Sequence, residues 1–275
     1  MGLGHLGEHS TSVPICLNLM SLGDSWWPTW GGAIHRKKNV IDTHLHILPG
    51  IDDGPETIEE SIALARVLVQ EGIHSAFATP HYNDEFPRRS AMEIQARVND
   101  MQRVLDGQNI PLQLFAGHEA LIGPGLIEDI QTGRLATLNG SRYLLLELWN
   151  SSWLPETERV IFELRAYGIV PIIAHPERYR AIQKDPNRLA TLLQQGVLAQ
   201  LTASSLIGMQ GSTTKHCAEA LLKKGLIHII ASDAHGLRTR MPAVKLGLQS
   251  AAKFLDKEYI HRMIETQPAA ILNEG

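Results

Sequence analysis

From Val40 to the C-terminus, short apolar segments alternate with longer segments of helical periodicity. Seven of these segments have the length and composition of buried strands: 40–46, 74–79, 112–116, 143–148, 169–174, 198–202 and 227–232. The predicted helices are 57–70, 91–105, 155–167, 186–195, 213–224, 243–255, 256–265 and 268–272. Because parallel strands need helical crossovers, this order predicts a single α/β domain over residues 40–275 that forms a closed or nearly closed (β/α)7 barrel.

Residues 1–39 differ from the rest of the chain. They are rich in Gly, Ser, Trp and His and show neither helical nor strand periodicity. We expect a disordered tail or an over-extended gene start, with Val40 as an alternative first residue.

The first predicted helix has a recognisable start. Thr57, with Glu60 three residues later, predicts a capping box there.

Metal-binding side chains follow six of the seven predicted strands. They are His44, His46, Asp52 and Asp53 after the first strand, His81 after the second, Glu119 after the third, Glu147 at the fourth, His175 after the fifth, and Asp233 and His235 after the seventh. The carboxyl ends of parallel strands share one face, and active sites form there. These donors exceed what one tetrahedral ion takes, so we expect two or three divalent metals. Mixed His and carboxylate donors suit Mn²⁺, Fe or Zn²⁺, and their spacing does not choose among these metals.

Three further residues are informative. Glu147 stands among leucines, where burying a carboxylate is costly unless the carboxylate is paired or binds metal. Arg178 and Arg240 follow two of the polar strand ends, and the planar guanidinium group fits phosphate oxygens. His118, beside Glu119, is interpreted as structural.

Composition excludes several other classes of protein. The net charge of −4 lacks the basic excess of nucleic-acid-binding proteins. The sequence contains no phosphate-binding P-loop, no Gly-x-Ser-x-Gly elbow and no apolar run of membrane-spanning length. Cys16 and Cys217 are the only cysteines, and Cys217 precedes a helix-like segment rather than a phosphate loop. Two cysteines give no disulfide framework, so a reducing cytoplasmic location is expected.

Seven motifs together resemble those of a known superfamily of metal hydrolases. They are Ile41-Asp42-Thr43-His44-Leu45-His46, Asp52-Asp53-Gly54-Pro55, Thr79-Pro80-His81, Gly117-His118-Glu119, Leu146-Glu147, Ala174-His175-Pro176-Glu177-Arg178-Tyr179 and Ala231-Ser232-Asp233-Ala234-His235. The chain from Val40 onward resembles the polymerase-and-histidinol-phosphatase (PHP) superfamily. Within it, the sequence is most similar to the bacterial manganese-dependent protein-tyrosine phosphatases of capsule and exopolysaccharide loci.

The resemblance implies a distorted seven-stranded barrel with a trinuclear Mn²⁺ centre, in which Fe, Zn or Mg are alternatives. The implied metal ligands are His44, His46, Asp53, His81, Glu119, Glu147, His175, Asp233 and His235, with Glu119 as a bridge. Arg178 and Arg240 would bind phosphate. The motif departs from the family at His118, where a small residue is common.

The predicted activity is hydrolysis of phosphotyrosine by a metal-activated hydroxide, with His81 or His235 available to protonate the leaving group. The expected substrate is an autophosphorylated, membrane-associated tyrosine kinase that regulates capsule or exopolysaccharide synthesis. Three alternatives remain at this stage: a small-molecule phosphomonoesterase such as histidinol-phosphate phosphatase, an exonuclease-like module, and a non-enzymatic regulatory partner of a kinase. Apolar helix faces leave homo-oligomerisation open.

Overall fold

The computed structural model describes residues 40–149 and 153–275, so the expectations for residues 1–39 lie outside the described residues. All strand pairings are parallel, as predicted. The strands are β1 (Val40–Leu45), β2 (Ile73–Ala78), β3 (His81–Tyr82), β4 (Gln113–Ala116), β5 (Glu119–Leu121), β6 (Tyr143–Glu147), β7 (Val170–Ala174), β8 (Leu198–Thr202) and β9 (Ile229–Ala231). They form two sheets, ordered β1-β2-β4 and β3-β5-β6-β7-β8-β9.

The parallel α/β class is therefore confirmed, but seven continuous strands are not observed. The predicted strands 74–79 and 112–116 are each followed by an additional short strand, β3 and β5, that the sequence did not predict. Thr79-Pro80 separates β2 from β3, and proline has no N–H to donate to a sheet. Gly117 separates β4 from β5 where the backbone passes close to Leu138, since a Cβ on Gly117 would lie 2.7 Å from the Leu138 Cδ2 atom.

The end of β9 returns to the end of β1. Leu45 and Ala234 form a parallel bridge. The Asp233 N–H donates to the His44 carbonyl at 2.9 Å, and the His46 N–H donates to the Ala234 carbonyl at 3.0 Å. These bonds close the strands into a distorted barrel and bring the first and last polar strand ends together.

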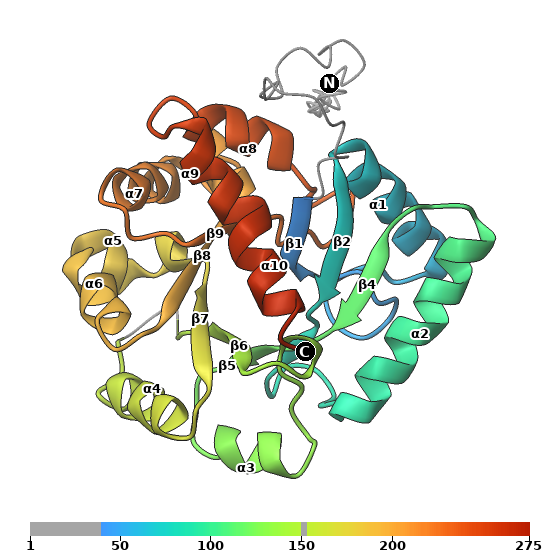
Figure 1. The fold of residues 1–275 in the computed structure, drawn as a ribbon, viewed down its shortest axis with the longest axis horizontal. Helices are drawn as coiled ribbons and strands as arrows, with labels where there is room; N and C mark the ends of the chain where they lie inside the picture. Colours follow the sequence, from blue (N-terminus) through green and yellow to red (C-terminus); the bar gives the residue numbers. More distant parts are fainter. Residues whose placement is uncertain (1–39, 150–152) are drawn as a thin grey trace, which may run out of the picture. The chain divides into compact units, whose positions relative to one another are not determined.

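Ten α-helices occur in the described residues. They are α1 (Ile58–Gln70), α2 (Ala91–Gly107), α3 (Leu126–Gln131), α4 (Glu156–Ala166), α5 (Arg180–Lys184), α6 (Asn187–Leu193), α7 (Ser212–Lys223), α8 (Val244–Ala251), α9 (Lys257–His261) and α10 (Gln267–Leu272). Figure 1 shows α1 to α8 around the strands and α10 crossing in front of them. None of the helices in these described ranges is long and apolar enough to cross a membrane.

Several helix ends differ from the predictions; α8, for example, was predicted to end at 255 and ends at Ala251. Thr57 caps α1 as predicted, but the Glu60 carboxylate accepts from the Glu56 N–H instead of completing a capping box. The complete capping box lies at α2, between Ser90 and Glu93. The helices predicted at 256–265 and 268–272 are joined, because a π-helical turn, Arg262–Thr266, connects α9 to α10.

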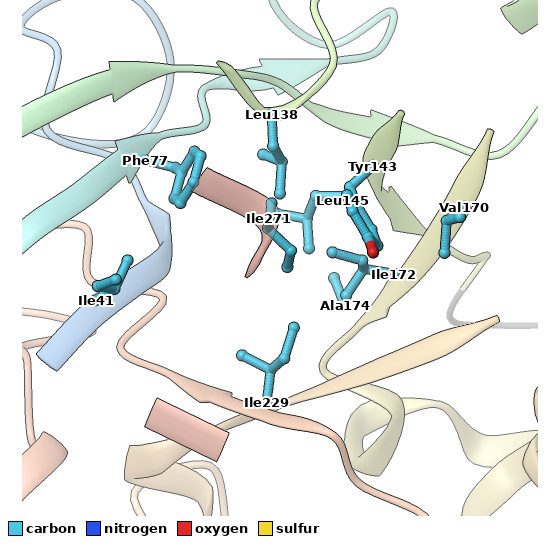
Figure 2. Close-up of a cluster of buried hydrophobic side chains, with 10 residues drawn as sticks. All are labelled: Ile41, Phe77, Leu138, Tyr143, Leu145, Val170, Ile172, Ala174, Ile229 and Ile271. Carbon is cyan, nitrogen blue, oxygen red and sulfur yellow. The ribbon is translucent and has the colours of Figure 1, made fainter. Parts of the chain in front are cut away.

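An apolar cluster fills the barrel below the carboxyl ends of the strands. Figure 2 shows Ile271 of α10 among side chains from several strands. The cluster consists of Ile41, Phe77, Leu138, Tyr143, Leu145, Val170, Ile172, Ala174, Ile229 and Ile271. Alternate residues of a strand point to the same side, so Tyr143 and Leu145 of β6 face this core together. The next residue of that series is Glu147.

Candidate metal centre

The end of β1 places two imidazoles together inside the barrel mouth. The Nε2 atoms of His44 and His46 are 3.1 Å apart, and both side chains are buried. The Nδ1 atom of His44 lies 2.8 Å from Gln200 Oε1, and that of His46 lies 2.6 Å from Asp52 Oδ2. Because both partners are acceptors, each Nδ1 carries the proton and each Nε2 lone pair faces the interior, as metal binding requires.

Gln200 was not selected from the sequence, and Asp52 was named at its strand end but not among the implied ligands. Asp52 also accepts from the His81 N–H at 3.1 Å. Burial alone would raise the pKa of Asp52, but the charge and hydrogen bond of His46 outweigh it and hold the pKa at about 2. Gln200 belongs to β8, the one predicted strand that ended without an ionisable group. A fully buried amide within the apolar strand Leu-Ala-Gln-Leu-Thr was the available signal for it.

Glu119 lies at the centre of the site. Its Oε2 atom is 3.0 Å from His81 Nδ1, 3.2 Å from His44 Nε2 and 3.3 Å from His46 Nε2. Its Oε1 atom is 2.8 Å from His175 Nε2. The side chain is buried, yet none of the three contacts to Oε2 is aligned as a hydrogen bond. One carboxylate therefore contacts histidines from three different strand ends.

Glu147 is the last residue of β6, not a mid-strand residue as predicted from the sequence. Its side chain is 26% exposed, and its carboxylate lies 3.9 Å from both His81 Nδ1 and His175 Nε2. Burial and the nearby charge of Glu119 raise the pKa of Glu147 to about 7. The burial cost expected for a mid-strand carboxylate is thus reduced by its position at the mouth.

The loops after β1 and β9 meet at Asp53. Its Oδ1 atom lies 3.4 Å from His81 Nε2 and 3.3 Å from His235 Nε2, and its Oδ2 atom pairs with Arg240. Burial alone would raise the pKa of Asp53, but these partners hold it well below the usual range. Asp53 and Arg240 are the more exposed groups of the site, so they lie at its rim.

Two site residues have strained backbone conformations. His175 has φ of 34° and Asp233 has φ of 50°, in the left-handed region that non-glycine residues rarely adopt. Each directly or closely follows a strand, where the chain leaves the barrel interior. Such strain concentrates at functional sites, because the surrounding fold must hold it in place.

Arg178 reaches the same interior from the turn after β7. Its guanidinium pairs with the Asp233 carboxylate, and its Nη2 atom donates to Thr202 Oγ1 at 3.2 Å. The neighbouring Glu177 is fully buried and its Oε1 atom accepts from Ser205 Oγ at 2.6 Å and from the Thr202 N–H at 3.1 Å. Thr202 at the end of β8 therefore links the turn that carries Arg178 to the site.

The electrostatics of the site favour bound positive charge. Burial would lower the pKa values of His44 and His81, but the carboxylates around them raise these values to about 9 and about 11. His175 and His235 show the opposite shift. Burial and neighbouring positive groups lower their pKa values to about 4. The carboxylates thus stabilise cations in the interior, while two imidazoles stay neutral.

The structure brings all nine predicted ligands into one cluster. Three groups have donor atoms within 4.8 Å of one another: His46, Asp53, His81 and His235; His44, His46 and Asp233; and His81, Glu119 and Glu147. His175 belongs to none of them and joins the cluster through Glu119. The buried Glu119 Oε2 and His235 Nε2 atoms lack hydrogen-bond partners. Orphaned donors of mixed nitrogen and oxygen type fit divalent transition metals.

Two residues that the sequence placed outside the site do lie outside it. His118 is buried, and its Nδ1 atom accepts from the Ala136 N–H at 2.9 Å. Cys217 is a buried, free cysteine within α7, and burial together with the Glu177 charge raises the pKa of its thiol to about 12. A thiol of this kind does not form a nucleophilic thiolate at neutral pH.

Comparison with known proteins identifies the family. The profile of the family described as capsular polysaccharide synthesis, CpsB/CapC, matches residues 40–273. The tyrosine-protein phosphatase YwqE of Bacillus subtilis is 34% identical over 220 residues, which cover 80% of this chain and 85% of the relative. The putative tyrosine-protein phosphatase CapC of Staphylococcus aureus is 34% identical over 201 residues, covering 73% of this chain and 79% of CapC.

A solved structure agrees with the sequence comparison. It comes from work on YwqE of Bacillus subtilis and CpsB of Streptococcus pneumoniae, described as metal-dependent tyrosine phosphatases. It superposes with a TM-score of 0.82 at 32% identity, covering 85% of this chain and 94% of the other. The resemblance inferred from the motifs is thereby confirmed, and the chain belongs to the CpsB/CapC family of capsular polysaccharide synthesis proteins.

Proposed function

We propose that this protein is a metal-dependent protein-tyrosine phosphatase. The names of its relatives and the solved structure described above support the activity. The observation that carries the proposal in this chain is Glu119, whose Oε2 atom lies within 3.3 Å of three imidazole nitrogens without a hydrogen bond to any of them. That arrangement supports a carboxylate that would hold metal together with these imidazoles, rather than one that closes a hydrogen-bond network.

The proposed metal ligands are His44, His46, Asp53, His81, Glu119, Glu147, His175, Asp233 and His235. Three overlapping donor groups support two or three ions, and the mixed donors support Mn²⁺, with Fe, Zn or Mg as alternatives. When bound, such ions supply an activated water and neutralise charge on the phosphoryl oxygens. The orienting contacts of Asp52 and Gln200 keep the two β1 imidazoles in the ligating tautomer.

Arg178 and Arg240 are the proposed phosphate-binding residues. Each guanidinium pairs with a carboxylate of the candidate metal centre, Asp233 for Arg178 and Asp53 for Arg240. Both are thus next to the place where a phosphate bound at the centre would sit. Their charge would stabilise the equatorial oxygens as negative charge develops in the transition state.

The leaving group sets modest demands on the protein. A tyrosyl phenolate has a conjugate acid of pKa about 10 and departs more readily than an alkoxide. His81 and His235 both contact Asp53 near the rim. The lowered pKa of His235, about 4, leaves it neutral, whereas the raised pKa of His81 keeps it protonated, so His81 is the proposed donor to the departing oxygen when it is not engaged as a metal ligand. No covalent phosphoenzyme is needed, and Cys217 takes no part.

The proposed substrate is an autophosphorylated tyrosine kinase, membrane-associated, that regulates capsule or exopolysaccharide synthesis, and the proposed location is the cytoplasm. The family description supports the link to capsule synthesis. The histidinol-phosphate alternative is not favoured, since the relatives are named tyrosine phosphatases. We further propose residues 40–275 as the catalytic domain, because the family profile begins at residue 40.

One experiment tests the activity directly. The purified protein is stripped of metal with a chelator, restored with Mn²⁺, and assayed on a phosphotyrosine peptide, histidinol phosphate and single-stranded DNA. We expect turnover of the phosphotyrosine peptide that depends on added metal. A strong preference for histidinol phosphate, or activity that survives complete metal removal, would overturn the proposal.

A further inference from the structure

The loop between β3 and α2 holds an aromatic ring against the candidate metal centre. The ring of Phe86 lies parallel to the imidazole of His81, with centroids 5.7 Å apart and planes inclined by 6°. This is the offset-stacked arrangement that aromatic rings favour. His81 in turn contacts Glu119 at 3.0 Å and Asp53 at 3.4 Å. Phe86 therefore borders the site through a single intervening side chain.

The backbone around Phe86 is fixed by a local hydrogen-bond network. The Oδ1 atom of Asn83, a buried residue, accepts the N–H groups of Glu85 at 2.9 Å and of Phe86 at 3.3 Å. An asparagine that bonds the backbone two and three residues later stabilises a tight turn. The adjacent Tyr82 side chain is also held, because its hydroxyl donates to Asp129 at 3.0 Å. Phe86 is thus presented from an ordered turn.

Solvent access distinguishes Phe86 from the other ring that contacts a site histidine in the described residues. Tyr179 lies 5.5 Å from His175, but it is only 2% exposed and its hydroxyl accepts from the Leu148 N–H. Phe86 is partly exposed. A molecule entering the mouth can therefore contact the Phe86 ring and cannot reach the Tyr179 ring.

An aryl phosphate bound at this centre would bring a ring to the same place. Its phosphoryl group is held among the ligands and the two arginines, so its leaving group points outward past the rim. In phosphotyrosine the aromatic ring begins one oxygen atom from phosphorus, at the depth of His81 and its stacked neighbour. An alkyl leaving group at that position has no π face to stack, and it would gain less from an aromatic surface.

We propose that Phe86 is a specificity-determining residue, which packs against the phenyl ring of phosphotyrosine and favours aryl over alkyl phosphates. This inference rests on the proposed phosphatase function and adds to it the residue that selects the leaving group. It assigns selectivity to the turn after β3, outside the metal ligands and the two arginines.

The test compares two non-hydrolysable ligands that differ by one ring. Dissociation constants of benzylphosphonate, in which a CH2 group replaces the bridging oxygen, and methylphosphonate are measured by calorimetry on the Mn²⁺-loaded full chain. The proteins are the wild type, Phe86→Leu, Phe86→Tyr and the control Phe162→Leu, in which the replaced phenylalanine is 67% exposed on α4. Metal content and unfolding temperature are checked for each variant.

We expect Phe86→Leu to weaken benzylphosphonate binding roughly three- to tenfold, the size of one aromatic pair, with methylphosphonate binding within about twofold of wild type. Phe86→Tyr should retain the ring preference, and Phe162→Leu should change neither constant. Equal weakening of both ligands, or an unchanged ratio of the two constants, would overturn the inference and leave Phe86 as a support for His81. Loaded wild-type protein that does not hydrolyse the phosphotyrosine peptide would instead overturn the proposed function, whatever the two constants show.

Discussion

The two ends of the barrel interior are built from the same strands and have opposite chemistry. Toward the amino ends, Tyr143, Leu145 and their neighbours form the apolar cluster that Ile271 completes (Figure 2). At the carboxyl ends, the next inward residue of β6 is Glu147, and His175 comes directly after Ala174, the last core residue of β7. One end excludes water and the other gathers buried imidazoles and carboxylates.

The contrast separates stability from function along each strand. Burying apolar side chains contributes to folding, roughly 1.5–3 kcal/mol for each large one. Burying titratable groups opposes folding unless they are paired or bind a cation. The mouth also carries the strained residues His175 and Asp233. We infer that the apolar end holds the polar end in place, and the following predictions test this division.

The largest effect is expected at the polar end. Replacing Glu147 or His44 by Ala should lower kcat/KM for a phosphotyrosine peptide by roughly a thousandfold or more, since lost metal stabilisation is worth several kcal/mol. Glu147→Ala should leave the urea midpoint of the metal-free protein unchanged or raise it, because Glu147 and Glu119 repel each other. Retention of a tenth of the activity, or a large loss of stability in Glu147→Ala, would contradict the division.

The complementary change is at the apolar end. Ile271→Ala should lower the free energy of unfolding by about 2–4 kcal/mol, because it removes a fully buried side chain and leaves a cavity. Mn²⁺ affinity of the folded protein should be unchanged. Urea unfolding and metal titration measure the two quantities, with Met92→Ala, which truncates a side chain that is 80% exposed on α2, as the control. A matching loss of metal affinity would show that the two ends are not separable.

A smaller effect is expected from the side chain that orients His46. Asp52→Asn should weaken Mn²⁺ binding about 10- to 100-fold, since the amide no longer provides a charged acceptor for the His46 ring. Calorimetric titration of stripped protein measures it. Asp84→Asn, at an exposed aspartate paired with Arg88, is the matched control. Wild-type affinity in Asp52→Asn would show that the contact has no role in the centre.

Thr202 tests how Arg178 is positioned. Thr202→Val keeps the shape of the side chain and removes the hydroxyl, which accepts from Arg178 Nη2 and donates to Asp233 Oδ2 at 3.4 Å. The lost contact to Arg178, worth about 1 kcal/mol, should raise the inhibition constant of inorganic phosphate about fivefold. Metal content should stay constant, and Thr202→Ser should restore phosphate binding. Full phosphate affinity in the valine variant would mean that Asp233 alone positions Arg178.

The smallest effect is expected at Cys217. Cys217→Ser should leave kcat within about twofold of wild type, because the thiol is buried in α7 and its raised pKa of about 12 keeps it protonated. In a Cys16→Ser background, iodoacetamide should label Cys217 far faster in urea than in buffer. Loss of turnover in Cys217→Ser with unchanged metal content would contradict a metal-based mechanism.

Local sequence patterns predicted the elements well where the signal was itself local. The alternation of strands and helices, the N-cap at Thr57 and the helix around Cys217 all follow from residues close together in the chain. The short strands β3 and β5 were missed, because two or three residues give too little pattern and their pairing partners lie on other strands. The short helix α5 was missed as well, since five residues give too little periodicity.

The sequence by itself determined which residues gather at the mouth, since parallel strands all present their carboxyl ends to one face. Only the tertiary structure decided how they are supported. His44 is oriented by Gln200, 156 positions away, and the short turn after β3 places Phe86 against His81. The sequence shows at which end of the barrel a polar strand-end residue lies. Its partner comes from another strand, and the closing of the barrel determines which partner that is.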